Sequence, residues 1–544
     1  MKGKRAVSGV WAAAFALAAG IFTSSVSGLA AAAQESAEST QNAGSFENST
    51  SLPVLVRERS YTGTQGEDAP SLVYFYYDQI HPCTVRFEEI LGGTPGAAAS
   101  GPEMSDGMSE AITKLNQEVS AFALSTESEY ENIAQSDYET YSGDWDYNRY
   151  ALNIDLMVQR LDEHVYSVLM QEYSYTNGAH GSTIFTGYNY NTADGTKLAL
   201  QDVFPDTSVL AEKIANRMRE LYPELTDDLF SVSVEQLIQG MIDETGYSGS
   251  LAFTLAPDCV NFWFGPGSVA AYAAGGQAVS FTYEELSGII KEAFVPAGSG
   301  DFIRQIPNFL AVNVPSGSGF AKLSLEGIEN QQDGYSTGEM SMHLTYGTTS
   351  MEERRYAYAY SGYYAQKDGV RYLIVNYLQD NDWQSTDIYR LGDDGIAKTT
   401  DSADGIYDFI PLDPSRFALK SRIYICGTTL RANLYSIRED GSINPFYPWY
   451  ADINTLAETG VTAKTDIQAQ IVTDQAAPEK ASLAEAVIPA GTVMNYYRTD
   501  NDRCMDFITQ DGTIYRITMD HGDGLDMING QQVTDLLDGV VYAG

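Results

Sequence analysis

Two strand-like runs on either side of a glycine-containing turn constrain this chain more than any other feature. Residues 152–171 alternate in polarity and are rich in Val, Tyr, Leu and Met, and residues 182–190 form a second run of this kind. Asn177-Gly178 lies between them, and both residue types tolerate the positive φ of a tight turn. The sequence therefore predicts a hairpin whose tip carries His180, one of 5 histidines in the chain.

The tip of this hairpin has two interpretations. Ala179 precedes His180 and Gly181 follows it, so a partner can approach the backbone closely. This predicts a binding loop that displays Tyr173, Tyr175 and His180. The alternative is a plain turn whose tyrosines pack on the sheet, because strands commonly hold aromatic residues.

Residues 172–181 resemble the Tyr-x-Tyr-Thr-Gly-Gly-Ala-His-Gly signature of the RsiV-like extracytoplasmic domain, with Asn177 in place of the first glycine. Residues 261–275 resemble a second element of that domain that ends in Ala-Pro-Tyr-Ala-x-Gly, although Gly267 and Ala271 replace its usual tyrosine and proline. Residues 200–204 are similar to its Leu-x-Asp-Leu-Phe element.

Such a domain forms the outer part of a lysozyme-sensing bacterial anti-sigma factor and also precedes the catalytic domain of PdaC-type peptidoglycan deacetylases. The resemblance implies a cationic protein such as lysozyme, or peptidoglycan, as the partner. It makes the hairpin tip and the second element the candidate binding site, which comprises Tyr173, Tyr175, Asn177, Gly178, His180, Gly181 and Tyr272.

The amino terminus has the three parts of a secretory signal. A basic start is followed by an apolar run to about Phe22 and by small residues up to Ala33, so residues 1–33 predict a cleaved signal peptide. An uncleaved membrane anchor is the alternative. Residues 34–51 are polar and predict a disordered tether. We therefore expect an exported protein, extracellular or in the cell envelope.

The formal net charge of -41 narrows the range of partners. Phosphate backbones would be repelled, which makes nucleic acid an unsuitable partner. Cationic proteins and divalent metal ions would be attracted. An acidic surface also keeps secreted proteins soluble, so the charge fits a chain without such a partner as well.

The fold class changes along the chain. Residues 52–150 predict a PdaC-like portion and residues 151–295 the RsiV-like domain, together an α+β half with helices packed on an antiparallel sheet. Helices are expected over 108–126, after Asp206 or Thr207, over 233–244 and from Thr282, where a capping box begins. Residues 296–310 predict a linker. Recurrent Asp-Gly turns over 311–544 predict an all-β domain, propeller-like or a sandwich, with a long excursion at 465–484.

No catalytic motif stands out. Residues 334–338 match Gly-x-Ser-x-Gly but sit between two alternating runs, which predicts a hairpin turn and not a nucleophile elbow. The paired-aspartate and two-histidine motifs of a polysaccharide deacetylase are not found. Residues 520–526 are rich in oxygen ligands, so calcium is weighed there against an ordinary acidic turn. The 4 cysteines allow three pairings, of which pairing within each half of the chain is preferred.

These observations favour a non-enzymatic binding protein of the cell envelope that captures a lysozyme-like protein or peptidoglycan, without catalytic or metal-ligating residues and without a cofactor. The first alternative is a carbohydrate-active hydrolase whose carboxylates the sequence does not reveal. The second is a structural component of the wall.

Overall fold

The computed structural model describes residues 52–62, 73–83, 90–91, 105–140, 150–176, 178–223, 232–245, 249–298, 300–317, 319–332, 335–380, 383–406, 413–452, 460–474, 478–521 and 526–542. The predicted signal peptide, the predicted tether and Asn177 lie outside these ranges. Within them, none of the helices combines the length and the apolar composition that crossing a bilayer requires.

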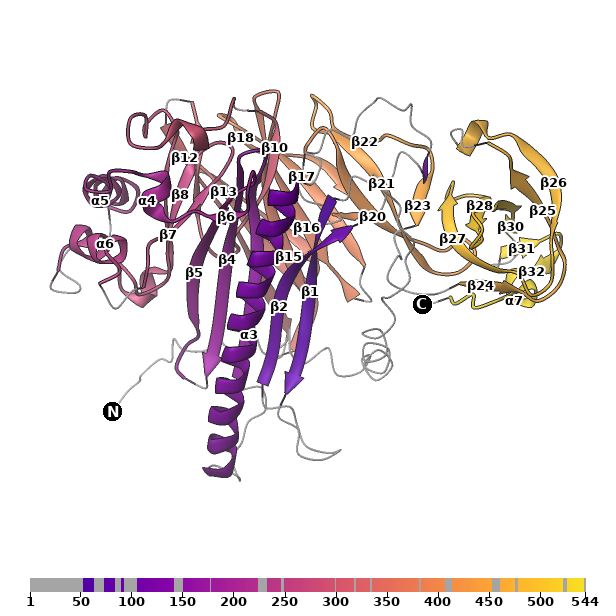
Figure 1. Cartoon of the computed structure of the whole chain (residues 1–544), viewed down its shortest axis with the longest axis horizontal. Coiled ribbons are helices and arrows are strands. Elements are labelled where there is room, and N and C mark those ends of the chain that lie inside the picture. The colour runs from indigo at the N-terminus through magenta and orange to yellow at the C-terminus, as the bar shows by residue number, and fades with distance from the viewer. Residues whose placement is uncertain are drawn as a thin grey trace.

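The first part of the chain forms a six-stranded sheet in the order β1-β2-β3-β4-β5-β6 (Figure 1). Its strands are β1 (Leu52–Thr62), β2 (Val73–Cys83), β3 (Tyr150–Leu161), β4 (Val165–Thr176), β5 (Ser182–Asn191) and β6 (Thr196–Lys197). β2 and β3 pair in parallel, and the other neighbours are antiparallel. The α+β class is confirmed, but the sheet is mixed, because a parallel pair needs a crossover and α3 supplies it.

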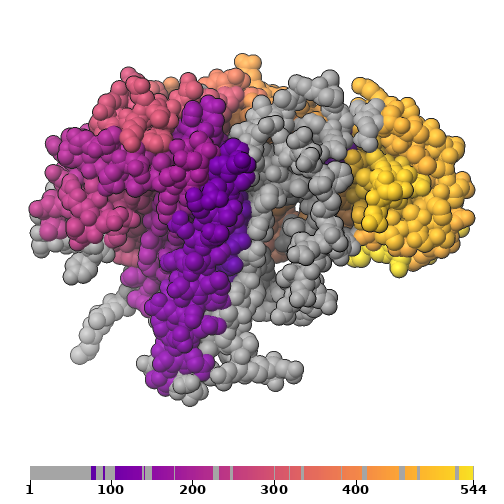
Figure 2. Space-filling model, in the orientation of Figure 1, coloured from indigo at the N-terminus to yellow at the C-terminus, as the bar shows by residue number. Residues whose placement is uncertain are grey.

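Helix α3 (Asp106–Thr140) covers one face of this sheet (Figure 1), and its outer side lies on the molecular surface (Figure 2). Leu115 and Val119 are one helical turn apart and pack on the buried side chains of Leu152 and Ile154. The helix extends beyond the predicted end at residue 126, since Ala134 packs on the buried ring of Tyr150.

Two local predictions in this part are wrong. The run 152–171 is two strands and not one, because the Asp162 carboxylate accepts the backbone N–H groups of His164 and Val165, at 2.8 and 2.9 Å, and turns the chain. The capping box at Thr282 does form, with the Glu285 N–H donating to the Thr282 hydroxyl at 3.2 Å. Only turns follow it, since Gly288 adopts a φ of 78° that no α-helix continues through.

The helices and a three-stranded sheet, in the order β7-β8-β9, form a second core. The elements are α4 (Leu200–Val203), α5 (Leu210–Leu221), α6 (Val234–Ile242), β7 (Ala252–Leu255), β8 (Val260–Phe264), β9 (Gln277–Phe281) and the 3-10 turns η2 (Tyr272–Ala274) and η3 (Glu292–Phe294). The two helices expected here are confirmed, but α5 begins after Val209, two or three residues beyond the expected cap at Asp206 or Thr207.

Two further sheets follow, of four strands (β11-β12-β13-β14) and of five strands (β10-β15-β16-β17-β18). Their strands are β10 (Phe302–Ile306), β11 (Val312–Ser316), β12 (Gly319–Gln332), β13 (Tyr335–Tyr346), β14 (Thr349–Tyr356), β15 (Ala359–Lys367), β16 (Val370–Leu378), β17 (Gln384–Gly392) and β18 (Gly395–Ser402). β10 falls inside the predicted linker 296–310, because Phe302, Ile303 and Ile306 are apolar and buried. Gln332 pairs with Tyr335, so residues 334–338 begin at a hairpin as expected.

The last part of the chain is also made of sheets, the largest with 12 strands. Its elements are β19 (Gly405–Ile406), β20 (Phe417–Ile423), β21 (Thr429–Ile437), β22 (Ile443–Pro445), β23 (Tyr450–Asp452), β24 (Val461–Ala463), β25 (Ile467–Val472), η5 (Pro478–Lys480), β26 (Leu483–Ile488), β27 (Val493–Thr499), β28 (Cys504–Ile508), β29 (Ile514–Thr518), β30 (Asp520–His521), β31 (Asp526–Ile528), β32 (Gln531–Gln532), α7 (Val533–Leu536) and β33 (Leu537–Asp538). The all-β class is confirmed. Among the described residues the sheets close neither into a barrel nor into a ring of blades.

Two further predictions are wrong, one for this last part and one for the cysteines of the whole chain. The expected excursion at 465–484 contains β25 and the start of β26, which pair with each other. The preferred cysteine pairing fails because Cys259, Cys426 and Cys504 carry free thiols. Cys426 lies in the core formed by β24 to β29, whereas Cys504 packs in a different cluster, around Trp449.

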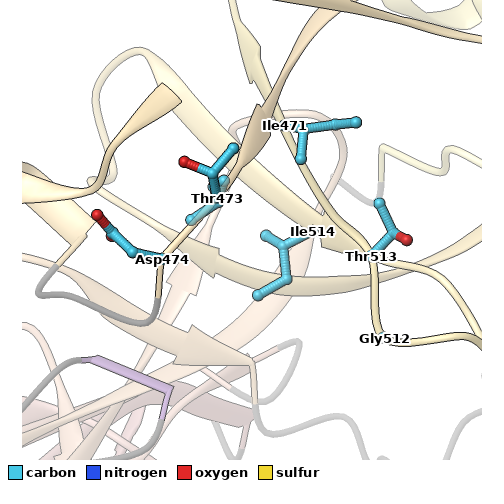
Figure 3. A pocket seen from close by; sticks show the side chains of 7 residues that line it. Ile471, Thr473, Asp474, Gly512, Thr513 and Ile514 are labelled. Carbon is cyan, nitrogen blue, oxygen red and sulfur yellow. The ribbon is translucent and has the colours of Figure 1, made fainter. Parts of the chain in front are cut away.

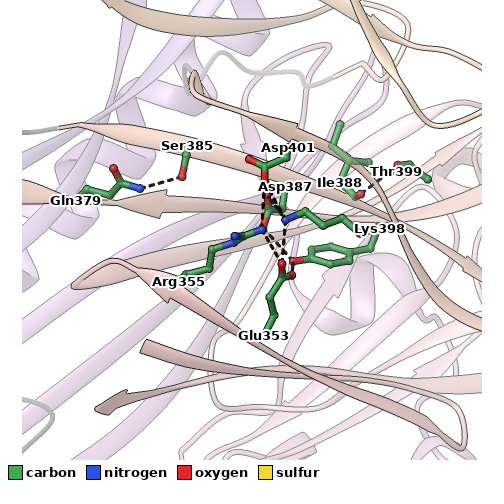
Figure 4. A network of polar contacts seen from close by, with 10 residues as sticks. Glu353, Arg355, Gln379, Ser385, Asp387, Ile388, Lys398, Thr399 and Asp401 are labelled. Carbon is green, nitrogen blue, oxygen red and sulfur yellow. Dashed lines mark hydrogen bonds and ion pairs between the residues drawn. The ribbon is translucent and has the colours of Figure 1, made fainter. Parts of the chain in front are cut away.

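A network of charged side chains ties the four-stranded sheet to the five-stranded sheet (Figure 4). Asp387 on β17 is 1% exposed and accepts from Arg355 Nε on β14 at 2.7 Å and from Lys398 Nζ on β18 at 2.9 Å. Glu353 contacts the same two cations, at 2.7 and 3.1 Å. Asp401 lies at the outer edge of the network and is 67% exposed.

Replacement of the buried carboxylate should therefore cost far more stability than replacement of the exposed one. We expect Asp387→Ala to lower the free energy of unfolding by about 3–5 kcal/mol, because it leaves two cations without their buried partner. The matched control Asp401→Ala should cost less than about 1 kcal/mol, as surface pairs are screened by solvent. Urea unfolding followed by circular dichroism measures both, and equal losses would contradict this account.

Candidate functional site

The hairpin formed by β4 and β5 has a buried base and an exposed tip. Ser174 and Ser182 are the last paired residues, and residues 178–180 lie beyond them in the turn. Gly178 and His180 are exposed, and Gly181 is half-buried. The predicted hairpin is thus present, and its histidine lies at the surface.

The second element that the sequence singled out lies against this tip. Tyr272, the first residue of η2, donates from its hydroxyl to the Gly181 carbonyl at 2.6 Å. Its ring stacks on the His180 imidazole with centroids 3.8 Å apart and an interplanar angle of 22°. Two segments 91 residues apart thereby form one aromatic pair, in which Tyr272 keeps 39% of its surface exposed.

The imidazole of His180 has a defined tautomer. Its Nδ1 lies 2.9 Å from the Gly181 carbonyl, which can only accept, so Nδ1 carries the hydrogen. In the neutral ring Nε2 is then the acceptor nitrogen. The tip therefore offers an aromatic face and a hydrogen-bond acceptor.

The two tyrosines of β4 differ in their roles. Tyr175 donates to the Gly178 carbonyl at 3.2 Å and so closes the turn. Tyr173 packs under the tip, and burial raises its pKa to about 12. A Cβ on Gly181 would lie 2.5 Å from the Tyr173 ring, so this close packing requires glycine.

A further glycine, Gly265, which the sequence analysis did not assign to the site, brings the two segments together. A Cβ on Gly265 would lie 2.5 Å from the Thr183 carbonyl, so any side chain would push the loop after β8 away from the start of β5. The available signal was the Gly-Pro-Gly run that directly follows the buried strand β8.

Of the seven candidate residues, six lie together here. Tyr173, Tyr175, Gly178, His180 and Gly181 belong to one hairpin, and Tyr272 joins it from η2. Asn177 is not among the described residues. The contribution of each to binding stays a prediction.

The predicted alternative sites are less developed. In the ranges that the structure describes, no three His, Cys, Asp or Glu side chains gather as a metal site. The loop weighed for calcium is described only in part, and there the Asp526 carboxylate accepts from the Cys426 N–H at 2.6 Å and from the Tyr542 hydroxyl at 2.8 Å. This carboxylate is thus engaged within the protein.

The C-terminal sheet has two shallow hollows. One of about 220 Å³ lies between the end of β25 and the start of β29, lined by Ile471, Thr473, Asp474 and Ile514 among others (Figure 3). A wider one of about 690 Å³ is lined in part by Asn495, Asp511 and Tyr515. Neither includes a residue that the sequence singled out, so the hairpin tip remains the candidate site.

Comparison with known proteins links the first part of the chain to one family. Residues 98–183 match the family model described as Deacetylase PdaC. The peptidoglycan-N-acetylmuramic acid deacetylase PdaC of Bacillus subtilis is 25% identical over 147 residues, which are 27% of this chain and 31% of that protein. The chain thus spans about a third of the length of this curated relative.

Two solved structures of DUF3298 family members show a weak likeness in fold. One from Bacteroides fragilis has 16% identity and a TM-score of 0.29, over 45% of this chain and 96% of that one. One from Pseudomonas aeruginosa PAO1 has 17% identity and a TM-score of 0.28, over 45% and 98%. The RsiV-like assignment of residues 151–295 stays a prediction. Residues 98–183, from before α3 to the hairpin tip, are similar to the PdaC family domain.

Proposed function

We propose that this chain is a non-enzymatic binding protein of the bacterial cell envelope, which contacts peptidoglycan through the tip of the β4–β5 hairpin. The observation that carries the proposal is the exposed stack of His180 on Tyr272. An aromatic face suits the apolar C–H face of a sugar ring, while Nε2 of His180 and the lone pairs of the Tyr272 hydroxyl can accept hydrogen bonds from its polar edge.

The surroundings of the stack fit an extended ligand. A Cβ on Gly178 would meet only the His180 carbonyl, at 3.7 Å, so the described part of the turn leaves open space beside this glycine. The base of the hairpin is rigid, since Glu172 and Ser174 are buried and paired with β3 and β5. A rigid base with an open tip is the arrangement in which binding residues are commonly held.

The family comparison supports the ligand class. The name of the B. subtilis relative specifies peptidoglycan as its substrate, and the matched segment 98–183 includes His180. Because the chain covers only about a third of that relative, the proposal extends to binding and not to deacetylation.

A cationic muramidase-like protein is the second candidate partner. It is favoured by the net charge of -41, which would steer a positively charged protein toward the surface and raise its association rate. The same loop would then form part of a protein interface, where exposed tyrosines are common.

Removal of the aromatic pair should weaken retention on insoluble peptidoglycan. We expect Tyr272→Ala and His180→Ala each to weaken binding roughly threefold to tenfold, which corresponds to an aromatic contact of about 0.5–1.5 kcal/mol. Tyr272→Phe should have a smaller effect, because it keeps the ring and loses only the hydrogen bond to Gly181. Sedimentation with purified sacculi measures the bound fraction.

The control for this experiment is Tyr424→Ala, which removes a tyrosine that is 42% exposed and lies beside another ring, that of Trp383. It should bind as the wild type does. If the four variants all bind as the wild type does, the hairpin tip is only a turn.

The two partner classes differ in their response to salt. Retention on immobilised lysozyme should fall steeply between about 0.01 and 1 M salt, because the Debye length shrinks from about 30 to 3 Å. Retention on peptidoglycan through ring stacking should change little over the same range. Release of reducing sugar from peptidoglycan by the purified chain would instead support the hydrolase alternative and overturn the non-enzymatic proposal.

A further inference from the structure

A short piece of the N-terminal half is buried in the C-terminal sheet. Ile90 and Leu91 lie between β2 and α3 in the sequence, yet Leu91 is 0% exposed and packs among residues of β20, β21 and β23. Figure 1 shows this piece as the short violet segment beside β23, among strands coloured orange. Among the described residues, the dipeptide Ile90–Leu91 therefore brings the first part of the chain into contact with the last part there.

The surface under Leu91 is shaped to receive a side chain. Three alanines, Ala418, Ala432 and Ala451, lie on adjacent strands, and Ala432 is the direct cross-strand partner of Ala451. Larger side chains, Leu434 and Trp449, stand beside them in the same cluster. Small residues next to large ones leave a depression in the face of the sheet, and Leu91 fills it.

The C-terminal sheet also forms a hydrogen bond with the backbone of the dipeptide. Arg498 on β27 donates from Nη1 to the Ile90 carbonyl at 2.6 Å, across a sequence separation of 408 residues. The Arg498 side chain is 2% exposed, so the bond forms away from water, where a charged donor is most effective. Its Nη2 has no hydrogen-bond partner among the described residues, which leaves a donor for a second acceptor.

Arg498 is itself fixed in place by buried charges. Its Nε donates to Asp506 at 2.7 Å, and Arg516 donates to the same carboxylate at 2.7 and 2.9 Å. The Arg516 guanidinium lies over the Trp449 ring, 4.4 Å from its centroid. The Arg498 guanidinium, which donates to Ile90, and the Trp449 ring, which lies beside Leu91, are thus linked through Asp506 and Arg516.

We propose that the C-terminal sheet carries a peptide-recognition pocket for an apolar dipeptide, and that Ile90–Leu91 of the same chain occupies it as a detachable latch. As far as the described residues define it, the contact consists of the buried Leu91 side chain, the partly buried Ile90 side chain and one charged hydrogen bond, which is small enough to open without unfolding either part. The segment stays in place because the chain keeps it at a high effective concentration. A peptide of the same chemistry is the partner that the emptied pocket would take.

The test uses the full chain and a fluorescein-labelled peptide with the sequence of residues 86–95. Leu91→Asp should empty the pocket by placing a charge in its apolar floor. We expect the variant to bind the peptide at least tenfold more tightly than the wild type, whose pocket is filled. Fluorescence anisotropy measures both titrations, and a peptide with Asp in place of Leu91 should bind neither protein.

Two further variants keep the experiment decisive. Leu124→Asp makes the same change on α3, at a leucine that is 56% exposed, and should leave peptide binding as in the wild type. If Leu91→Asp does not fold, Leu91→Ala replaces it and should give the same order of affinities. Failure of the folded variant to bind the peptide, or equal binding by variant and wild type, would overturn the proposal. Neither result bears on retention on peptidoglycan, which depends on the hairpin tip.

Discussion

One apolar core holds the parts of this chain together. Met157, Leu169 and Phe185 of the six-stranded sheet and Trp263 of the three-stranded sheet share a cluster with residues of both sheets that follow, from Phe302 to Leu391. Since Leu152, Ile154, Val168 and Met170 face α3 on the opposite side, the central strands β3 and β4 are buried on both faces. A sheet in this position cannot shift by one residue without placing the wrong side chains in both cores.

The shared core also fixes where the hairpin tip can lie. β5 runs so close to β7 that a Cβ on Gly187 would lie 1.9 Å from the Phe253 carbonyl, and Gly265 repeats this close approach near the tip. The two glycines set the distance between the sheets at two points along β5. The stack of His180 on Tyr272 results from this spacing, because it lies where both elements leave the core.

Local signals in the sequence were sufficient to predict much of the fold. Alternation identified most strands, and the helix expected over 233–244 is α6, at whose start the structure shows both capping hydrogen bonds between Ser233 and Gln236. The glycine at the hairpin tip and the tyrosine of η2 were recognised by their motifs. The motifs did not predict that the two segments touch. That contact depends on the packing of β8 against β5.

The remaining errors have local causes in some places and tertiary contacts in others. Thr282 and Glu285 formed the expected box without a helix, and residues 467–472 became a strand because β26 and β29 lie on either side of them. Alternation alone could not show the break at Asp162, whose side chain makes the turn. Leu91 had no local signal at all, since its pocket consists of residues more than three hundred positions away.

The distance along the chain between Ile90 and Arg498 has a consequence for how the protein is made. Contacts that close large loops form late, because the entropy of the intervening chain must be lost first. During synthesis the leucine leaves the ribosome long before β27 exists, so it spends that interval without its binding pocket. The bond between Arg498 and the Ile90 carbonyl can therefore form only after the chain has been made through β27, 408 residues after Ile90.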